Sequence, residues 1–367
     1  MKIPAFDLAP VASELRDDLL ERWSGLLERT AFVGGADVEA FEAAFAEYLG
    51  AGGCVGVANG TDALHVALRA LDLRPGDEVI LPAFTFFATA EAVVLAGGVP
   101  VLADVEAATC NLDPEDAARR ITGRTRGIVT VHLYGQPSDL DALSEICGSR
   151  GLWLVEDAAQ AHGARWHGHR VGTFGSLSGW SFYPSKNLGC FGDGGAITGM
   201  DPELLGRARR IANHGRTAQY EHGVVGTNSR LDGLQAAVLS LRLPRLDDDN
   251  ERRREIAAAY RAGLEGIGDL AFPEVPQAAE PVYHQVTIRT GSRDALREHL
   301  LREEIGSGVY YPLPVHRQPG MAGLVPAGLA LPEAERAARE CLSLPVFPQL
   351  ADDAVDRVCQ AIRNFFG

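Results

Sequence analysis

The chain has 367 residues, 46% of them hydrophobic, and a formal net charge of −15, so it is long enough for a large buried core and for two domains. The acidic excess argues against a nucleic-acid partner, because binding to phosphates needs a basic face. No apolar run is long enough to span a bilayer, and the six cysteines show neither a CxxC pair nor metal-ligand spacing with the histidines. We therefore expect a cytoplasmic protein with free thiols, no metal and no membrane contact.

Strands and helices alternate after an N-terminal helical segment that covers residues 11 to 49. Apolar strands are expected at Cys54–Ala58, Glu78–Leu81, Pro100–Asp104, Gly127–Leu133, Trp153–Glu156, Leu177–Phe182 and Ala196–Thr198. Helices are expected at Asp62–Leu71, Ala88–Ala96, Pro114–Arg120 and Leu140–Arg150. This alternation predicts an α/β fold, in which helices cover both faces of a mostly parallel, seven-stranded sheet.

The composition changes after Leu243-Pro244. A charged run from Asp247 to Arg254 opens a helix that continues to about Leu264, and we interpret the run as the solvated face of a connecting helix. The remaining elements, at 283–289, 294–304 and 351–365, suit a smaller α+β domain. We therefore predict a large domain over residues 1–244, which includes the N-terminal helices, and a small domain over residues 245–367.

Several predicted strands end next to polar or aromatic side chains, and ligands of such sheets bind at the carboxyl ends of the strands. Asn59-Gly60-Thr61-Asp62 opens a helix whose N-terminus suits a phosphate, although an ordinary helix cap by Thr61 or Asp62 explains the same residues. Phe86 follows the second strand, where it can stack on an aromatic ring or belong to the core.

Two further strand ends carry opposite charges. Asp157 closes an apolar strand, where a carboxylate is costly unless it meets a cation. Lys186 follows the strand that stops at Tyr183-Pro184, beside a loop with four glycines between Gly189 and Gly195. A single lysine at a loop edge is usually a surface charge, but an amine in apolar surroundings can lose its proton and attack a carbonyl.

Together these strand ends match the needs of pyridoxal phosphate. The cofactor requires a phosphate cradle, a stacking face, a carboxylate at its pyridine nitrogen and an amine that forms a Schiff base with its aldehyde. The candidates for these tasks are, in order, Gly60, Thr61 and Ser181, then Phe86, then Asp157, and finally Lys186.

Five motifs, spread over nearly the whole chain, resemble the DegT/DnrJ/EryC1/StrS family of sugar aminotransferases. They are Ala58-Asn-Gly-Thr-Asp-Ala-Leu64, Pro82-Ala-Phe-Thr-Phe86, Glu156-Asp-Ala-Ala-Gln-Ala-His-Gly163, Ser181-Phe-Tyr-Pro-Ser-Lys-Asn-Leu-Gly189 and Gly226-Thr-Asn-Ser-Arg-Leu-Asp-Gly-Leu-Gln-Ala-Ala237. The resemblance implies the fold-type-I architecture of aspartate aminotransferase. One departure is Ser185, where the family usually has Gly or Thr before the lysine.

The resemblance also implies the roles of individual residues. Lys186 would carry the cofactor, Asp157 would pair with its ring nitrogen, and Gln160 would bond its phenolic oxygen. Its phosphate would lie against Thr61, Asp62, Ser181 and, from the neighbouring subunit, Asn228. A homodimer with shared active sites is therefore implied.

The implied reaction is a two-stage transamination through the pyridoxamine phosphate form, with L-glutamate as donor and a nucleotide-linked keto-sugar as acceptor. Arg230 is a candidate for binding the donor carboxylate as a bidentate fork, or it forms a surface ion pair. The candidates for the acceptor pocket are His162, Tyr183, His214, Arg216, His284 and His316.

The position of the keto group follows from weaker similarities. Asp62 and the segment His132-Leu-Tyr-Gly-Gln136 resemble members that act at C-3, so a dTDP-linked 3-keto-6-deoxyhexose is favoured over a UDP-linked 3-keto sugar or a C-4 substrate. The dehydrase branch of the family has His at the position of Lys186, which argues against a dehydrase. A non-catalytic sensor is disfavoured because Lys186, Asp157 and Gln160 are all present.

Overall fold

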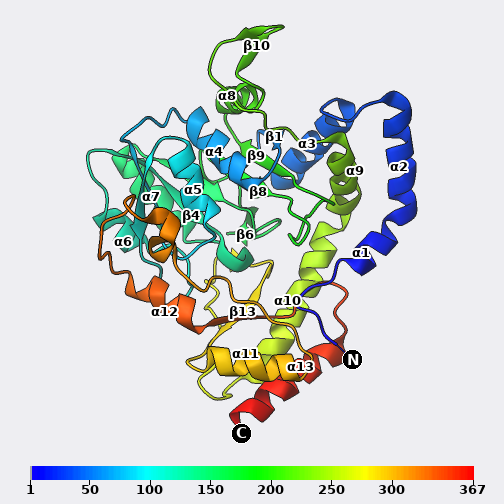
Figure 1. Ribbon diagram of the computed structural model, residues 1–367, viewed down its shortest axis with the longest axis vertical. Coiled ribbons are helices and arrows are strands. Elements are labelled where there is room, and N and C mark those ends of the chain that lie inside the picture. Colours follow the sequence, from blue (N-terminus) through cyan, green and yellow to red (C-terminus); the bar gives the residue numbers. More distant parts are fainter. Residues whose placement is uncertain (1) are drawn as a thin grey trace.

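The computed structural model describes residues 2–367 and has a central sheet of seven strands in the order β1-β9-β8-β5-β4-β2-β3 (Figure 1). The five strands from β8 to β3 are parallel, and β9 runs antiparallel to both of its neighbours. The expected α/β fold is confirmed, and the predicted strand ends differ from the observed ones by at most two residues. The strands are β1 (Gly53–Val57), β2 (Glu78–Pro82), β3 (Val99–Ala103), β4 (Thr125–Val131), β5 (Trp153–Asp157), β8 (Leu177–Ser181) and β9 (Gly195–Gly199).

Helices cover both faces of this sheet because alternate strand residues point to opposite sides. Ile80, Ile128 and Leu154 pack in one core with α2, α3, α6, α7 and α9, whereas Val79 and Val129 pack on the other face with α4, α5 and α12. The helices that cover the sheet are α2 (Arg16–Arg29), α3 (Ala36–Leu49), α4 (Gly60–Ala70), α5 (Ala88–Leu95), α6 (Pro114–Arg119), α7 (Leu140–Arg150), α8 (Pro202–Ala212), α9 (Gly233–Arg242) and α12 (Pro332–Glu340).

A separate core lies around the long helix α10 (Leu246–Leu264) and the two-stranded sheet of β13 (Val286–Arg289) and β14 (Cys341–Leu344). Helices α11 (Arg293–Arg302) and α13 (Asp352–Phe366) complete it, and Ile3 from the start of the chain packs there too. Conversely, α12 lies in the C-terminal third of the chain but packs against the large sheet. The C-terminal third of the chain therefore contributes to both cores.

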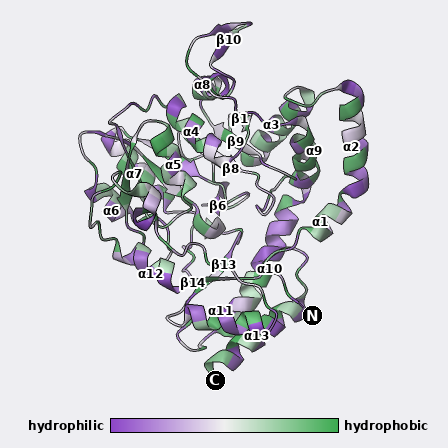
Figure 2. Ribbon diagram, in the orientation of Figure 1, coloured by the Kyte–Doolittle hydropathy of each residue, from purple (hydrophilic) through white to green (hydrophobic). Residues whose placement is uncertain are grey.

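The charged run at the start of α10 is hydrophilic (Figure 2), but it is not wholly solvated as expected. Asp247 and Asp248 are exposed, whereas Asn250 and Arg253 are buried. The buried amide of Asn250 accepts a hydrogen bond from Asn187 and donates one to the carbonyl of His162. These contacts with distant segments cannot be read from the charges along the run.

A hairpin of β10 (Arg216–Ala218) and β11 (Glu221–His222) projects from the body beyond α8 (Figure 1). Its tip residue Tyr220 is 88% exposed, and Val225, which follows β11, is 82% exposed. The sequence did not predict this hairpin. Within residues 2–367, none of the helices combines the length and apolar character that a membrane crossing requires.

Candidate active site

Lys186 and Asp157 lie at the ends of neighbouring parallel strands. β5 ends at Asp157, which pairs with Gly179 of β8, and β8 ends at Ser181 shortly before Lys186. A turn follows in which Lys186 N donates to Tyr183 O at 2.8 Å. The parallel arrangement therefore brings the carboxylate and the amine to the same edge of the sheet.

Each of these two groups perturbs the other. Burial lowers the pKa of Lys186 to about 8, and the opposite charge of Asp157 works against that shift. Burial also raises the pKa of Asp157, although bonds from Thr89 and Ala159 and the charge of Lys186 oppose the rise. Among residues 2–367 the Lys186 amine has no hydrogen-bond or ion-pair partner, so its nitrogen is available to a ligand.

The Asp157 carboxylate is fixed by two donors. Thr89 Oγ1 donates to Oδ2 at 2.8 Å, and the backbone N–H of Ala159 donates to Oδ1 at 3.2 Å. Thr89 lies in the first turn of α5 and was not among the predicted site residues. Its contribution depends on a contact between segments far apart in the chain, for which the local sequence carries no signal.

The start of α4 forms a cradle next to the end of β8. The helix cap is Asn59, whose Oδ1 accepts from Asp62 N at 2.8 Å, so the alternative explanation, a cap by Thr61 or Asp62, is wrong. Thr61 and Asp62 are instead half-buried in the first turn of the helix. A β-carbon on Gly60 would lie 2.6 Å from Cβ of Ser181, so the absence of a side chain keeps this helix N-terminus open. Such an N-terminus suits a phosphate.

Gln160 and the aromatic side chains of Phe86 and Tyr311 form another part of the candidate site. Gln160 Oε1 accepts from Tyr134 N at 2.7 Å, and Nε2 donates to Tyr311 Oη at 3.1 Å. The Phe86 side chain is 56% exposed, and its ring centroid lies 5.6 Å from that of Tyr311. Phe86 therefore presents an aromatic face rather than filling the core. Tyr311 is a site residue that the sequence did not indicate.

Buried polar groups fix the loop that carries the lysine. Asn187 Nδ2 donates to Asn250 Oδ1 at 2.8 Å and to Val282 O at 3.0 Å. Both amide hydrogens are thereby used, so Asn187 Oδ1 accepts from His284 Nδ1 at 3.2 Å. Arg242 donates to the carbonyl of Asn187 at 3.2 Å. The loop is thus attached to α9, to α10 and to the segment that precedes β13.

Two of the expected acceptor residues are enclosed, which corrects the sequence-based expectation. The His162 ring is fully buried, 5.2 Å from Trp180 and 5.8 Å from Phe182 between ring centroids, and burial lowers its pKa to about 3. His316 Nε2 bonds Glu335 at 3.0 Å, and its Nδ1 is buried. Neither ring presents an accessible atom to a sugar. His284 is also buried, but it adjoins the lysine loop.

The remaining expected residues are exposed. Tyr183 is 55% exposed in the turn before Lys186. His214 and Arg216 lie at the base of the hairpin, and Arg230 and Asn228 lie beyond it; all four are exposed, and no contact joins them to Lys186. The roles of these residues therefore stay predictions. To take part in catalysis they would have to contact the active site of a second subunit.

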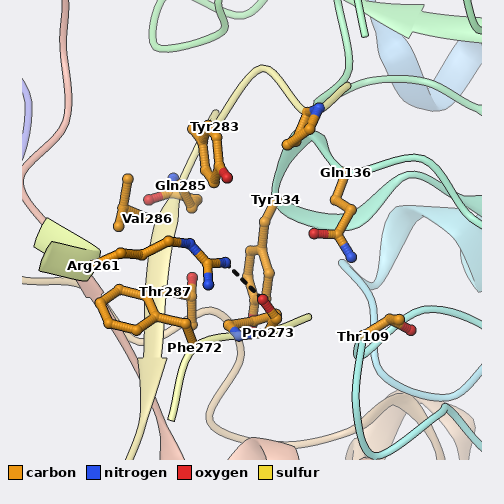
Figure 3. Close-up of a pocket in the computed structure, with 11 residues that line it drawn as sticks. Thr109, Tyr134, Gln136, Arg261, Phe272, Pro273, Tyr283, Gln285, Val286 and Thr287 are labelled. Atoms are coloured by element: carbon orange, nitrogen blue, oxygen red, sulfur yellow. Dashed lines mark hydrogen bonds between the residues drawn. The ribbon is translucent and has the colours of Figure 1, made fainter. Parts of the chain in front are cut away.

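A small cavity lies behind the candidate site, between β13 and the segment after β4 (Figure 3). Arg261 closes one side by donating to Pro273 O at 2.7 Å, and Tyr134 forms the other. The volume of about 20 Å³ accommodates about one water molecule. Tyr134 N bonds Gln160, so this cavity adjoins the back of the site and is too small for a substrate.

Pyridoxal phosphate fits the residues at the sheet edge. The open helix terminus at Gly60 can accommodate an anion, and the exposed ring of Phe86 can stack on a flat aromatic group. Asp157 can accept from a protonated ring nitrogen, and Lys186 supplies an amine of lowered pKa. Gln160 Nε2 retains a second hydrogen for an oxygen on the ring.

Comparisons with known proteins cover the whole chain. The sequence profile of the DegT/DnrJ/EryC1/StrS aminotransferase family matches residues 14–363. The dTDP-3-amino-3,4,6-trideoxy-alpha-D-glucose transaminase of Streptomyces venezuelae is 45% identical over 364 residues, which cover 99% of this chain and 96% of that protein. A protein of Geobacillus stearothermophilus named pleiotropic regulatory protein is 43% identical over 368 residues, which cover 100% and 99%. The crystal structure of S. venezuelae DesV in complex with a ketimine intermediate is similar with a TM-score of 0.97 and 45% identity, covering 99% of this chain and 98% of that one.

Proposed function

Since this chain belongs to the DegT/DnrJ/EryC1/StrS aminotransferase family, we propose that it uses pyridoxal phosphate to transfer an amino group from L-glutamate to a dTDP-linked 3-keto-6-deoxyhexose. The observation that carries the proposal is the placement of Lys186 and Asp157 at the ends of adjoining strands, with the pKa of the lysine lowered to about 8. A structural ion pair would raise the pKa of the lysine, whereas burial here lowers it to about 8, so the share of neutral, nucleophilic amine near neutral pH is larger than for an exposed lysine.

When bound, the cofactor supplies an aldehyde that captures the amino group and a protonated ring that draws electrons from the donor carbon. The protein supplies position and proton transfer. With its lowered pKa, Lys186 Nζ can accept a proton near neutral pH and return it to a neighbouring carbon. The carboxylate of Asp157, held by Thr89 and Ala159, would keep a positive charge on the ring nitrogen of the bound cofactor.

The substrate class rests on similarity to the S. venezuelae transaminase, whose name specifies a dTDP-linked 3-amino sugar. The presence of Asp62 in the first turn of α4 agrees with a C-3 preference. The segment from His132 to Gln136 contributes to the site indirectly, through two contacts. His132 Nε2 lies 3.1 Å from Glu156 Oε2, and Tyr134 N donates to Gln160 Oε1. UDP-linked 3-keto sugars and C-4 substrates are the alternatives.

We also propose a homodimer in which Asn228 and Arg230 of each subunit serve the other subunit's site. The exposure of both side chains and the projecting hairpin support this arrangement. All six cysteines are buried free thiols, which suits the reducing cytoplasm.

A second candidate function is a cofactor-binding regulator without turnover, which the name of the Geobacillus relative favours. Both functions require a bound cofactor, so only turnover separates them.

The test is to incubate the pyridoxamine phosphate form with dTDP-linked and UDP-linked 3-keto and 4-keto sugars and to locate the new amine by NMR. We expect amination at C-3 of the dTDP-linked 3-keto sugar. A Lys186→Ala variant is the control, which should bind the sugar nucleotide without producing the amine. If the wild-type protein aminates none of these sugars although it binds them, the regulator is favoured instead.

A further inference from the structure

Two buried threonine hydroxyls stand in line behind the carboxylate of Asp157. Thr89 Oγ1 lies 2.8 Å from Asp157 Oδ2, and Thr85 Oγ1 lies 3.1 Å from Thr89 Oγ1. Thr89 is 1% exposed and Thr85 is 3% exposed, so water does not compete for these bonds. Both residues lie at the start of α5 or just before it, where the N-terminal end of a helix favours a negative charge.

The direction of the two bonds follows from the chemistry of the groups. An ionised carboxylate only accepts hydrogen bonds, so the hydroxyl hydrogen of Thr89 points at Asp157. Thr89 Oγ1 is then an acceptor toward Thr85, whose own hydrogen must point at Thr89. The three groups therefore form one polarised chain of donors that ends on the carboxylate, and each bond in such a chain strengthens the next.

In the part of the chain that the structure describes, no second side chain donates a hydrogen bond to the Asp157 carboxylate. Among residues 2–367, the remaining donor to the Asp157 carboxylate is the backbone N–H of Ala159, on the other oxygen. The charged or titratable groups that face Asp157 are Lys186, His132 and Tyr311. Burial raises the pKa of Asp157, and the bond from Thr89 is the largest of the influences that oppose this rise.

We propose that Thr89 is a positioning residue that keeps the Asp157 carboxylate ionised and aimed at the ring nitrogen of the cofactor, and that Thr85 polarises the Thr89 hydroxyl. The inference rests on the proposed function, because it assumes that Asp157 meets a protonated pyridine nitrogen. It adds two residues that act through Asp157 without contacting the cofactor.

The test compares the binding of two probes to the full-length, cofactor-free protein by fluorescence titration. One probe is pyridoxal phosphate, and the other is its analogue with carbon in place of the ring nitrogen. Both carry the same aldehyde and phosphate, so only the contact with Asp157 differs. The variants are Thr89→Val, Thr89→Ser and Thr85→Val. The matched control is Thr287→Val, which removes a buried hydroxyl that bonds Ser343 Oγ at 2.8 Å in the other core.

We expect Thr89→Val to weaken the binding of pyridoxal phosphate by about ten- to a hundredfold, as the loss of a hydrogen bond to a charged group implies, and to leave the analogue within about twofold. Thr89→Ser should restore binding, and Thr85→Val should weaken it by about two- to fivefold. On acidification, the binding of pyridoxal phosphate to Thr89→Val should begin to weaken at a higher pH than its binding to the wild-type protein. The reason is that a carboxylate without its donor takes up a proton more readily.

The outcomes separate the inference from its premise. If the wild-type protein binds both probes equally, the role of Asp157 in the proposed function is wrong. If the wild-type protein prefers pyridoxal phosphate and Thr89→Val keeps that preference in full, the inference about Thr89 is wrong. Circular dichroism and the Thr89→Ser variant exclude misfolding as the cause of a loss.

Discussion

A β-carbon placed on Gly60 would lie 2.6 Å from Cβ of Ser181, so the first residue of α4 and the last residue of β8 meet at one point. This contact joins the proposed phosphate cradle to the strand that leads to Lys186. It also explains why the position requires glycine, although the backbone there is helical.

Gly60→Ala should therefore weaken cofactor binding by at least about tenfold, since the new methyl group must displace Ser181 or the helix start. Alanine is the better helix former by about 1 kcal/mol, so an effect of helix propensity alone would stabilise the protein. Urea unfolding and fluorescence titration measure the two effects. The control is Gly148→Ala in α7, where no atom lies within 4 Å and binding should not change. Normal cofactor affinity in Gly60→Ala would contradict the assignment of the cradle.

The lowered pKa of Lys186 predicts a dependence of stability on pH. The unfolded lysine has a pKa of about 10.4, whereas burial lowers the folded value to about 8. Between these values the unfolded lysine binds more protons than the folded one, so the Lys186 contribution to the free energy of unfolding should rise with pH, by about 1–3 kcal/mol in total. The buried cysteines, whose pKa values burial raises, contribute in the opposite direction, so the Lys186 contribution is read as the difference between two variants.

This dependence is measured by urea unfolding of the cofactor-free protein between about pH 8 and about pH 10. Lys186→Met should lose stability relative to the wild-type protein as the pH rises, whereas Lys2→Met, which alters an exposed residue, should keep the pH dependence of the wild-type protein. An equal slope in the wild-type protein and Lys186→Met would show that Lys186 is not desolvated.

The shared active site can be tested by complementation. Lys186→Ala should be inactive, and Asn228→Asp should be strongly impaired because its carboxylate would repel a phosphate. If Asn228 serves the partner's site, mixed dimers of the two variants contain one intact site each, and an equal mixture should recover about a quarter of the wild-type activity. No recovery, although mixed dimers are detected by mass spectrometry, would place Asn228 in the site of its own chain.

The strands that carry the site could be predicted because apolar runs and their polar end residues are local features. The end of β5 at Asp157 and the turn at Lys186 are examples. The division at residues 244 and 245 stays a prediction. Ile3 packs in the C-terminal core and α12 packs on the large sheet, so such a division would not follow the packing at every point.

The contacts between distant segments could not be predicted. Thr89 reaches Asp157 because α5 packs on the sheet that contains β5, and Tyr311 reaches Gln160 because the segment before α12 packs against the same sheet. His162 was expected at the substrate because it lies in a loop where the resembled family builds its acceptor pocket, but its ring packs against Trp180 and Phe182. A motif places a residue near a site without fixing the direction of its side chain.

The central claim is that the Lys186 amine bonds covalently to the cofactor. Lys2 is the other lysine of the chain, which makes the assignment unambiguous. The measurement is reduction of the cofactor-loaded protein with borohydride, followed by peptide mass spectrometry. We predict a single reduced cofactor on the peptide that contains Lys186. A label on Lys2 or on the terminal amine, or no label on a protein that has bound the cofactor, would contradict the account.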